Sequence, residues 1–169
     1  RDIVKRDYPN DDAVDKIKII EKLGLTFSVN NIIGFPDETR ELAFDTIELN
    51  RRFNSDNTSC SILVPFHGTE LHAYAVEKGY LDPNVICAIS NSGESLLNMP
   101  QWDKKDMTRL RDVFAMYIKF PKDRWPEIKR AETDDKLRYE LREEFVKTYW
   151  SDSTAKIEDD IAEAAKGLF

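Results

Sequence analysis

The chain has 169 residues, 41% of them hydrophobic and 34% charged, which predicts one water-soluble domain with a sizeable core. Its net charge of −7 argues against broad binding to nucleic acid or to an anionic membrane, because phosphate groups are neutralised by a basic face. Two cysteines, Cys60 and Cys87, are too few for a disulfide framework or a cysteine metal cage, and they predict a reducing, cytoplasmic setting. No apolar run approaches the ~20 residues that span a bilayer, and no secretory leader is visible.

The first part of the chain predicts a helix followed by a strand. Apolar residues at helical spacing over 13–23 indicate the helix, and Gly24 ends it as a C-cap. Residues 25–33 form the predicted strand, which Gly34 and Pro36 stop.

The same order then repeats. Thr39 is a candidate N-cap for a helix over 40–53, a second short strand is expected over 59–64, and Thr69 caps a helix over 70–78. Short loops between such elements are typical of α/β units, and the helical crossover implies parallel strands. Two strands cannot make a sheet that buries both faces, so we expect further strands upstream of Arg1 in a longer protein.

The second part of the chain has a different character. Residues 82–100 form a long irregular segment, a kind of loop that is usually functional or disordered. Helices are then expected from Asp103 to the stop at Pro121, over 125–132, from Thr133 or Asp134 onward, and from Ser153 or Thr154 through Ala165.

Polar residues at the ends of the two predicted strands are the candidate site residues. Asn30 and Asn31 interrupt an apolar strand, and a buried amide without partners costs roughly 1–3 kcal/mol. Two alternatives stay open: these amides bond neighbouring backbone, or they line a ligand site. Asp37 is expected to meet the positive N-terminus of the next helix, whereas the role of Glu38 stays open.

No metal site is expected from the two histidines. His67 follows a strand directly and could therefore face a pocket, whereas His72 is predicted to be a surface residue of a helix. Their five-residue gap does not place both on one helical face. Gly34 and Gly68 belong to neither a dinucleotide-binding fingerprint nor a P-loop.

A mixture of basic and aromatic residues over 119–130 is the remaining hint of nucleic-acid binding. Asp123, Glu127 and Glu132 interleave with these residues, so a solvated helical surface is the favoured interpretation.

Two segments in this order resemble a known enzyme family. Residues 31–39 (NIIGFPDET) and 64–71 (VPFHGTEL) are similar to the second half of the radical S-adenosylmethionine barrel. The similar subgroup has an upstream cobalamin-binding domain and includes the anaerobic magnesium-protoporphyrin IX monomethyl ester oxidative cyclase. Residues 3–8, 77–81 and 110–131 resemble further parts of that subgroup, in the same order.

The resemblance implies an α/β fold in two parts. Residues 1–82 would supply the last βα units of a partial (β/α)6 TIM-like barrel. Residues 83–169 would supply an irregular linker and an all-α C-terminal extension, with 83–100 a linker or a substrate-side lid.

The resemblance also implies an activity for the longer protein. In this family a CxxxCxxC loop holds a [4Fe-4S] cluster, which cleaves S-adenosylmethionine to start radical chemistry on an organic substrate. This chain contains no CxxxCxxC, so the cluster ligands, and any cobalamin domain, are expected upstream. The isolated chain is expected to bind no cluster and to catalyse nothing.

Six residues match positions that contact S-adenosylmethionine in this family: Asn30, Ile32, Gly34, Val64, Pro65 and Arg6. The first three match the fifth-strand motif that packs along the adenine, although the family often has Gly where this chain has Asn30. The next two match the sixth-strand end, which usually touches adenine through its backbone. Arg6 is a candidate for the carboxylate, and His67 and Glu38 would line the mouth of the barrel.

The expected partners follow from this interpretation: the upstream part of the same polypeptide, a small organic substrate and a reductant protein. Unpaired strand edges predict that the isolated piece self-associates. A rival hypothesis is a non-catalytic α/β and helical module that binds a protein. A third, RNA modification, would require a basic RNA-binding domain, and the acidic tail speaks against it. Cyclisation and methylation of the substrate both stay open.

Overall fold

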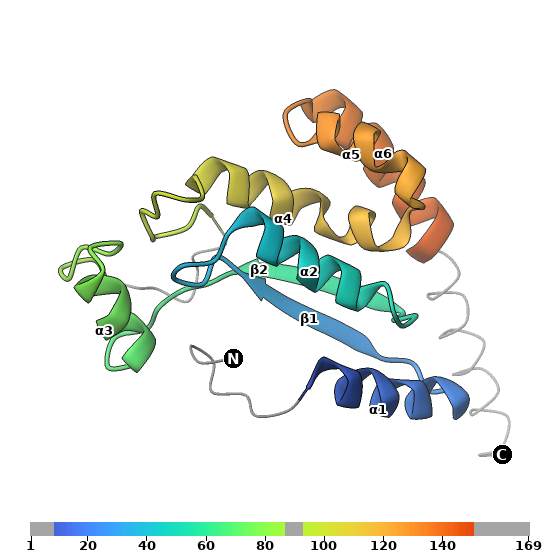
Figure 1. The fold of residues 1–169 in the computed structure, drawn as a ribbon. Helices are drawn as coiled ribbons and strands as arrows, with labels where there is room; N and C mark the ends of the chain where they lie inside the picture. The colour runs from blue at the N-terminus through green and yellow to red at the C-terminus, as the bar shows by residue number, and fades with distance from the viewer. Residues whose placement is uncertain (1–8, 87–92, 151–169) are drawn as a thin grey trace, which may run out of the picture.

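The computed structural model describes residues 9–86 and 93–150 (Figure 1). In chain order its elements are α1 (Asn10–Lys22), β1 (Ser28–Ile33), α2 (Arg40–Asn50), β2 (Asn57–Ile62), α3 (Glu70–Glu77), α4 (Lys104–Lys119), the 3-10 turn η1 (Lys122–Arg124), α5 (Trp125–Ala131), α6 (Asp135–Phe145) and the π-helical turn η2 (Val146–Trp150). Three predictions fall on other residues: Arg6, Cys87 and the last helix starting at Ser153 or Thr154 lie outside the described residues.

A small parallel sheet confirms the mixed α/β class. β1 and β2 pair in parallel, from Ser28 beside Asn57 to Ile33 beside Ile62, and α2 provides the crossover. Over the described ranges the sheet contains these two strands, so a barrel is not shown. No helix in the described parts is long and apolar enough to cross a membrane.

The strand boundaries differ from the predicted ones. β1 starts at Ser28 rather than at residue 25, and β2 covers Asn57–Ile62 rather than 59–64. Asp56 explains the early start of β2, because its carboxylate accepts the Phe27 N–H at 2.8 Å and its own N–H donates to the Phe27 carbonyl at 3.1 Å. These bonds begin the ladder at polar residues, which an apolar pattern does not detect.

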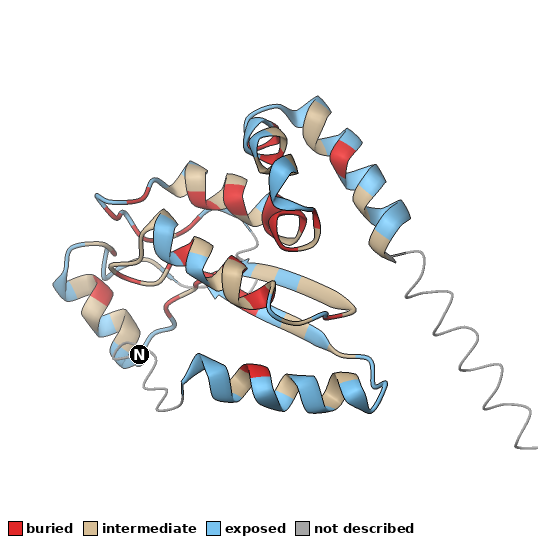
Figure 2. Ribbon diagram, turned by 45° about the vertical axis from the view of Figure 1, so that its right-hand side comes forward, coloured by how far each residue is buried: buried red, intermediate tan, exposed pale blue. Residues whose placement is uncertain are grey.

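Within the described residues, one face of the sheet is covered by helices and the other is open. Along β1, Asn31 and Ile33 are buried, whereas the alternate residues Ser28, Asn30 and Ile32 are exposed. On β2 the exposed residues are Ser59 and Ser61. Figure 1 shows α2 and α4 on one side of the sheet and α3 beyond the ends of the strands. In Figure 2 the buried positions gather between the sheet and these helices, while α1 is largely exposed.

The core is shared by both parts of the chain. Its buried members on the strands and α2 include Ile33, Ile62 and Ile47, and on α4 they are Met107, Leu110, Val113, Phe114, Met116, Tyr117 and Ile118. The segment before α4 also packs here, because Leu97, Met99 and Trp102 are buried and the Asn98 N–H donates to the Tyr80 carbonyl at 2.7 Å. The boundary at residue 82 stays a prediction, although one core extends across it.

Local capping chemistry fixes the helix ends. Thr39, Thr69 and Asp134 accept a backbone N–H of the first turn of α2, α3 and α6, which confirms them as N-caps. Gly24 follows α1 at φ +67°, as expected of a C-terminal glycine. The predicted extension of α2 to Phe53 is wrong: the helix ends at Asn50, and the Arg52 N–H turns back to the Leu49 carbonyl at 3.1 Å.

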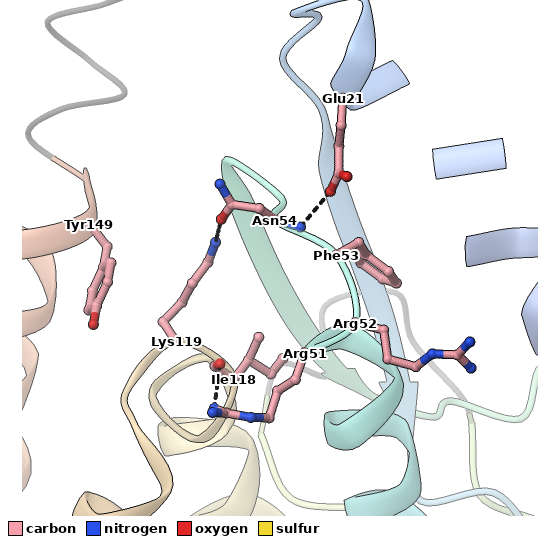
Figure 3. Close-up of a pocket in the computed structure, with 8 residues that line it drawn as sticks. All are labelled: Glu21, Arg51, Arg52, Phe53, Asn54, Ile118, Lys119 and Tyr149. Atoms are coloured by element: carbon pink, nitrogen blue, oxygen red, sulfur yellow. Dashed lines mark hydrogen bonds between the residues drawn. The ribbon is translucent and has the colours of Figure 1, made fainter. Parts of the chain in front are cut away.

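Arg51, just after α2, binds the end of α4. Its Nη1 lies 2.8, 2.7 and 2.7 Å from the carbonyl oxygens of Tyr117, Ile118 and Phe120, which lack partners within the helix. Its guanidinium also lies over the Trp125 ring, 5.7 Å from the centroid. Figure 3 shows Arg51 directed at Ile118, with Lys119 reaching back to Asn54. These contacts join the ends of α2 and α4.

We predict that Arg51→Met lowers the free energy of unfolding by roughly 2–3 kcal/mol, because three carbonyls lose a charged donor. Arg52→Met is the matched control, since Arg52 makes an exposed ion pair with Asp11, and a change within about 0.5 kcal/mol is expected. Denaturant unfolding of the purified variants measures both. Equal effects would contradict this role of Arg51.

Candidate functional site

The candidate site lies where both parallel strands end, at one edge of the sheet. β1 runs into a loop over 34–39, and β2 runs into a loop over 63–69. The Leu63 N–H donates to the Ile33 carbonyl at 2.8 Å, which holds the starts of these loops side by side. The carboxyl ends of parallel strands are the usual ligand-binding edge of α/β folds.

Gly34 opens the first loop and is required there for two reasons. Its φ is +83°, a conformation that favours glycine, and a Cβ at this position would lie 3.3 Å from the Met107 sulfur and 3.5 Å from Ile62 Cγ2. The close approach is therefore to α4 and β2. This packing accounts for the glycine whether or not a ligand contacts it.

Glu38 closes the same loop. Its Oε2 accepts the N–H groups of Gly34 at 2.5 Å and Phe35 at 2.9 Å. Burial raises the pKa of the Glu38 carboxyl above its ordinary value, and the two N–H donors oppose that rise. The Glu38 carbonyl also accepts the Gln101 side-chain N–H at 3.2 Å, which connects the loop to the segment before α4.

Asp37 adopts a left-handed conformation, with φ 64°. Its carboxylate accepts the Tyr80 hydroxyl at 2.8 Å and the Tyr74 hydroxyl from α3. These donors hold the pKa of Asp37 below its usual value. The expectation that Asp37 meets the N-terminus of the next helix is wrong, because Thr39 fills that role and Asp37 faces the tyrosines.

The two strand asparagines have different environments. Asn31 is buried and exchanges hydrogen bonds with Asn50, at 2.9 and 3.3 Å, and donates to the Ser59 carbonyl at 3.1 Å. Asn30 faces the open side, where its Oδ1 accepts the Ser59 hydroxyl at 2.7 Å. Of the two alternatives, a structural network explains Asn31, whereas a ligand role for the exposed Asn30 stays a prediction.

The structure brings five of the six predicted S-adenosylmethionine residues to this edge. Asn30 and Ile32 share the exposed face of β1, and Gly34 follows them. Val64 is half-buried and Pro65 buried in the adjacent loop. Arg6 lies outside the described residues. That these residues contact a ligand stays a prediction.

The two histidines come together although their spacing argued against it. The rings of His67 and His72 are 4.3 Å apart, because His67 precedes α3 and folds back onto its first turn. The prediction of His72 as a surface residue is wrong: it is half-buried, and its Nε2 has no partner in the described parts of the chain. Among the described residues, no group of three or more His, Cys, Asp or Glu side chains is placed to hold a metal ion.

Cys60 lies on β2 opposite Asn31, and it is partly buried. Burial, followed by the charge of Glu38, raises the pKa of Cys60 to about 12. Thiolate, the form that reacts as a nucleophile, is therefore scarce at neutral pH.

The burial of Glu132 was not predicted from the sequence. Glu132 was expected on a solvated surface, yet only 2% of the residue is exposed. Its carboxylate accepts from Arg40 at 2.5 Å, Tyr117 at 2.7 Å and Lys129 at 2.8 Å. Burial and the adjacent carboxylate raise the pKa of Tyr117. This network joins α2, α4 and α5.

A pocket of about 450 Å³ lies near the start of β2, at the opposite end of the strands (Figure 3). Its polar lining is already engaged: Arg51 binds carbonyls of α4, Arg52 pairs with Asp11, and Glu21 accepts the Asn54 N–H at 2.6 Å. Lys119 donates to Asn54 and to the Ser55 carbonyl, and burial lowers its pKa. This pocket is therefore a weaker candidate than the strand ends.

Comparison with known proteins gives one partial relationship. A stretch of 69 residues is 38% identical to an uncharacterized methyltransferase of Pyrococcus horikoshii and covers 41% of this chain. The matched stretch spans only 15% of that protein's length. No family model matches the chain, and no solved structure gives a significant match.

We predict a pH-dependent difference between the natural protein and Glu38→Gln. Because folding raises the pKa of Glu38, the protonated form favours the folded state, and this stabilisation is lost as the pH rises through the raised value. The natural protein should therefore lose stability relative to Glu38→Gln between about pH 4 and about pH 7. Glu41→Gln is the control, because its own backbone N–H and Thr39 lower the pKa of Glu41. Relative to Glu41→Gln, the natural protein should gain stability as the pH rises. Chemical unfolding at both pH values tests this.

A second prediction concerns the Cys60 thiol, studied with Cys87 replaced by Ser. With a pKa raised to about 12, Cys60 should react with iodoacetamide at least about fiftyfold more slowly than a free thiol near pH 8. Unfolding in urea should restore the rate. Mass spectrometry measures the modification, and fast reaction of the folded protein would contradict the burial of this thiol.

Proposed function

We propose that this chain is part of an S-adenosylmethionine-dependent enzyme of the radical type, and that the ends of β1 and β2 bind the adenosine half of that molecule. The observation that carries the proposal is the open face of β1, which presents Asn30 and Ile32 beside the strand-end loops. The partial relative supports it, because its name describes a methyltransferase and methyltransferases commonly use S-adenosylmethionine.

The open face favours a larger assembly around this sheet. Each described strand has one partner, and Ile32 leaves 48% of its surface exposed on the uncovered side. Additional strands of a partial (β/α)6 barrel would pair the outer edges and convert this face into the wall of a cavity. The helices after residue 103 would remain outside, since α4 packs on the opposite face.

Each residue has a defined role in this proposal. Ile32 offers an apolar surface to the adenine. The Asn30 Oδ1 accepts from Ser59, so its Nδ2 is left to donate to an acceptor nitrogen of the base. Val64 and Pro65 contribute backbone groups from the adjacent loop, and Arg6 remains the candidate for the carboxylate. Glu38 holds the loop closed around Gly34.

The [4Fe-4S] cluster does not fit the described residues of this chain. Among them no group of three or more His, Cys, Asp or Glu side chains is placed to hold it. Its ligands belong to another part of the longer protein, where the bound cluster would supply the electron that cleaves S-adenosylmethionine. An upstream cobalamin domain would suit methyl transfer, which the name of the relative favours over ring formation.

We predict that Ile32→Ala in the full-length protein weakens S-adenosylmethionine binding by roughly tenfold, through lost apolar contact. Leu42→Ala is the matched control, because Leu42 on α2 is 50% exposed, nearly the same as the 48% of Ile32, but lies away from the open face. Equilibrium dialysis with S-adenosylmethionine gives both dissociation constants, and thermal melting verifies folding. Equal affinities for the two variants would contradict the proposed site.

A further inference from the structure

The carboxylate of Asp37 links two loops that are separate in the sequence. Asp37 belongs to the loop after β1, whereas Tyr74 lies on α3 and Tyr80 directly follows that helix. α3 itself begins at the end of the loop after β2. Two phenol hydroxyls therefore attach the first strand-end loop to the helix that anchors the second.

Further contacts extend this connection on both sides. The ammonium of Lys78 lies 5.3 Å from the centre of the Tyr74 ring. Tyr74 and the charge of Asp37 raise the pKa of Lys78. The Tyr80 carbonyl accepts the Asn98 N–H at 2.7 Å, which adds the segment before α4. The residue after Asp37 is Glu38, whose carboxylate binds the N–H groups of Gly34 and Phe35.

The backbone at Asp37 makes the choice of residue informative. A φ of 64° favours glycine, so an aspartate here carries a conformational penalty that glycine would avoid. If Asp37 served only the backbone turn, Asp37→Gly would leave the loop after β1 as well ordered as before or make it better ordered. If the carboxylate is needed to connect the loops, Asp37→Gly loosens them.

We propose that Asp37 is a positioning residue: clamped by Tyr74 and Tyr80, it fixes residues 34–38 and 63–66 of the two strand-end loops relative to each other, so that both loops bind one ligand together. The ligand part rests on the proposed function, with S-adenosylmethionine as the bound molecule. The clamp itself is a property of the described chain and is tested separately.

The first measurement is hydrogen exchange of the full-length protein without ligand, followed by mass spectrometry of peptides covering the two loops. Tyr74→Phe/Tyr80→Phe and Asp37→Gly should each accelerate exchange in both loops by about tenfold. Adding Asp37→Gly to the double tyrosine variant should not raise the exchange rate further, because the tyrosine changes already remove the interaction that Asp37→Gly removes. Tyr139→Phe is the matched control, since Tyr139 is 64% exposed on α6 and remote from this contact.

Two results would overturn the clamp. One is acceleration confined to loop 34–38, which would make Asp37 a local turn residue. The other is full additivity of Asp37→Gly and the tyrosine changes, which would show that they act independently.

The second measurement is the dissociation constant for S-adenosylmethionine in the same variants. The clamp variants should bind about tenfold more weakly than the natural protein and Tyr139→Phe. Loosened loops with unchanged affinity would overturn the positioning role while leaving the proposed function in place. A natural protein that does not bind S-adenosylmethionine would overturn the proposed function, and with it the ligand part, while the exchange experiment still decides the clamp.

Discussion

The packing of α4 against the sheet is the constraint on which the rest of the structure depends. Two parallel strands present little apolar surface, and they hold their shape only when one face is buried by a larger apolar element. α4 supplies that surface through side chains such as Met107, Leu110 and Phe114. The close approach of Met107 to Gly34 shows how directly this packing reaches the strand ends. Arg51 holds the other end of α4 by its last carbonyls, so the helix is fixed along its length.

This one-sided packing also leaves one face of the sheet uncovered by the described residues, and we propose that face for ligand binding. Since α2 and α4 cover one face, the alternate residues of β1 and β2 point to the uncovered side. The loops that follow the strands are held by carboxylates: Glu38 binds the first loop internally, and Asp37 attaches it to the tyrosines of the α3 region. We propose that the adenosine half of S-adenosylmethionine binds at this edge, between the strands and their loops.

Local chemistry allowed much of the fold to be predicted from the sequence. Thr39, Thr69 and Asp134 cap their helices through contacts within three residues, and the helical crossover implied parallel strands. Features that depend on distant partners were not predictable. Glu132 is buried because Arg40, 92 residues away, reaches it, and no periodicity reports such a pair.

In the candidate site, too, features set by the order of elements were predictable, and features set by distant partners were not. The positions of Asn30, Ile32, Gly34, Val64 and Pro65 at one edge follow from the order of strands and loops, although their contact with a ligand rests on resemblance. The partner of Asn31 could not be foreseen, because Asn50 comes beside it only once α2 folds over the sheet. Likewise, only the turn before α3 brings His67 onto His72.

One measurement tests most directly the proposal that the longer protein cleaves S-adenosylmethionine. The full-length protein would be purified without oxygen, reconstituted with iron and sulfide, and incubated with dithionite and S-adenosylmethionine, after which 5′-deoxyadenosine is quantified. We expect 5′-deoxyadenosine to form, and to disappear when the cluster cysteines elsewhere in the protein are replaced by Ala. A full-length protein that takes up no cluster and forms no 5′-deoxyadenosine would contradict the claim and favour a non-catalytic binding module.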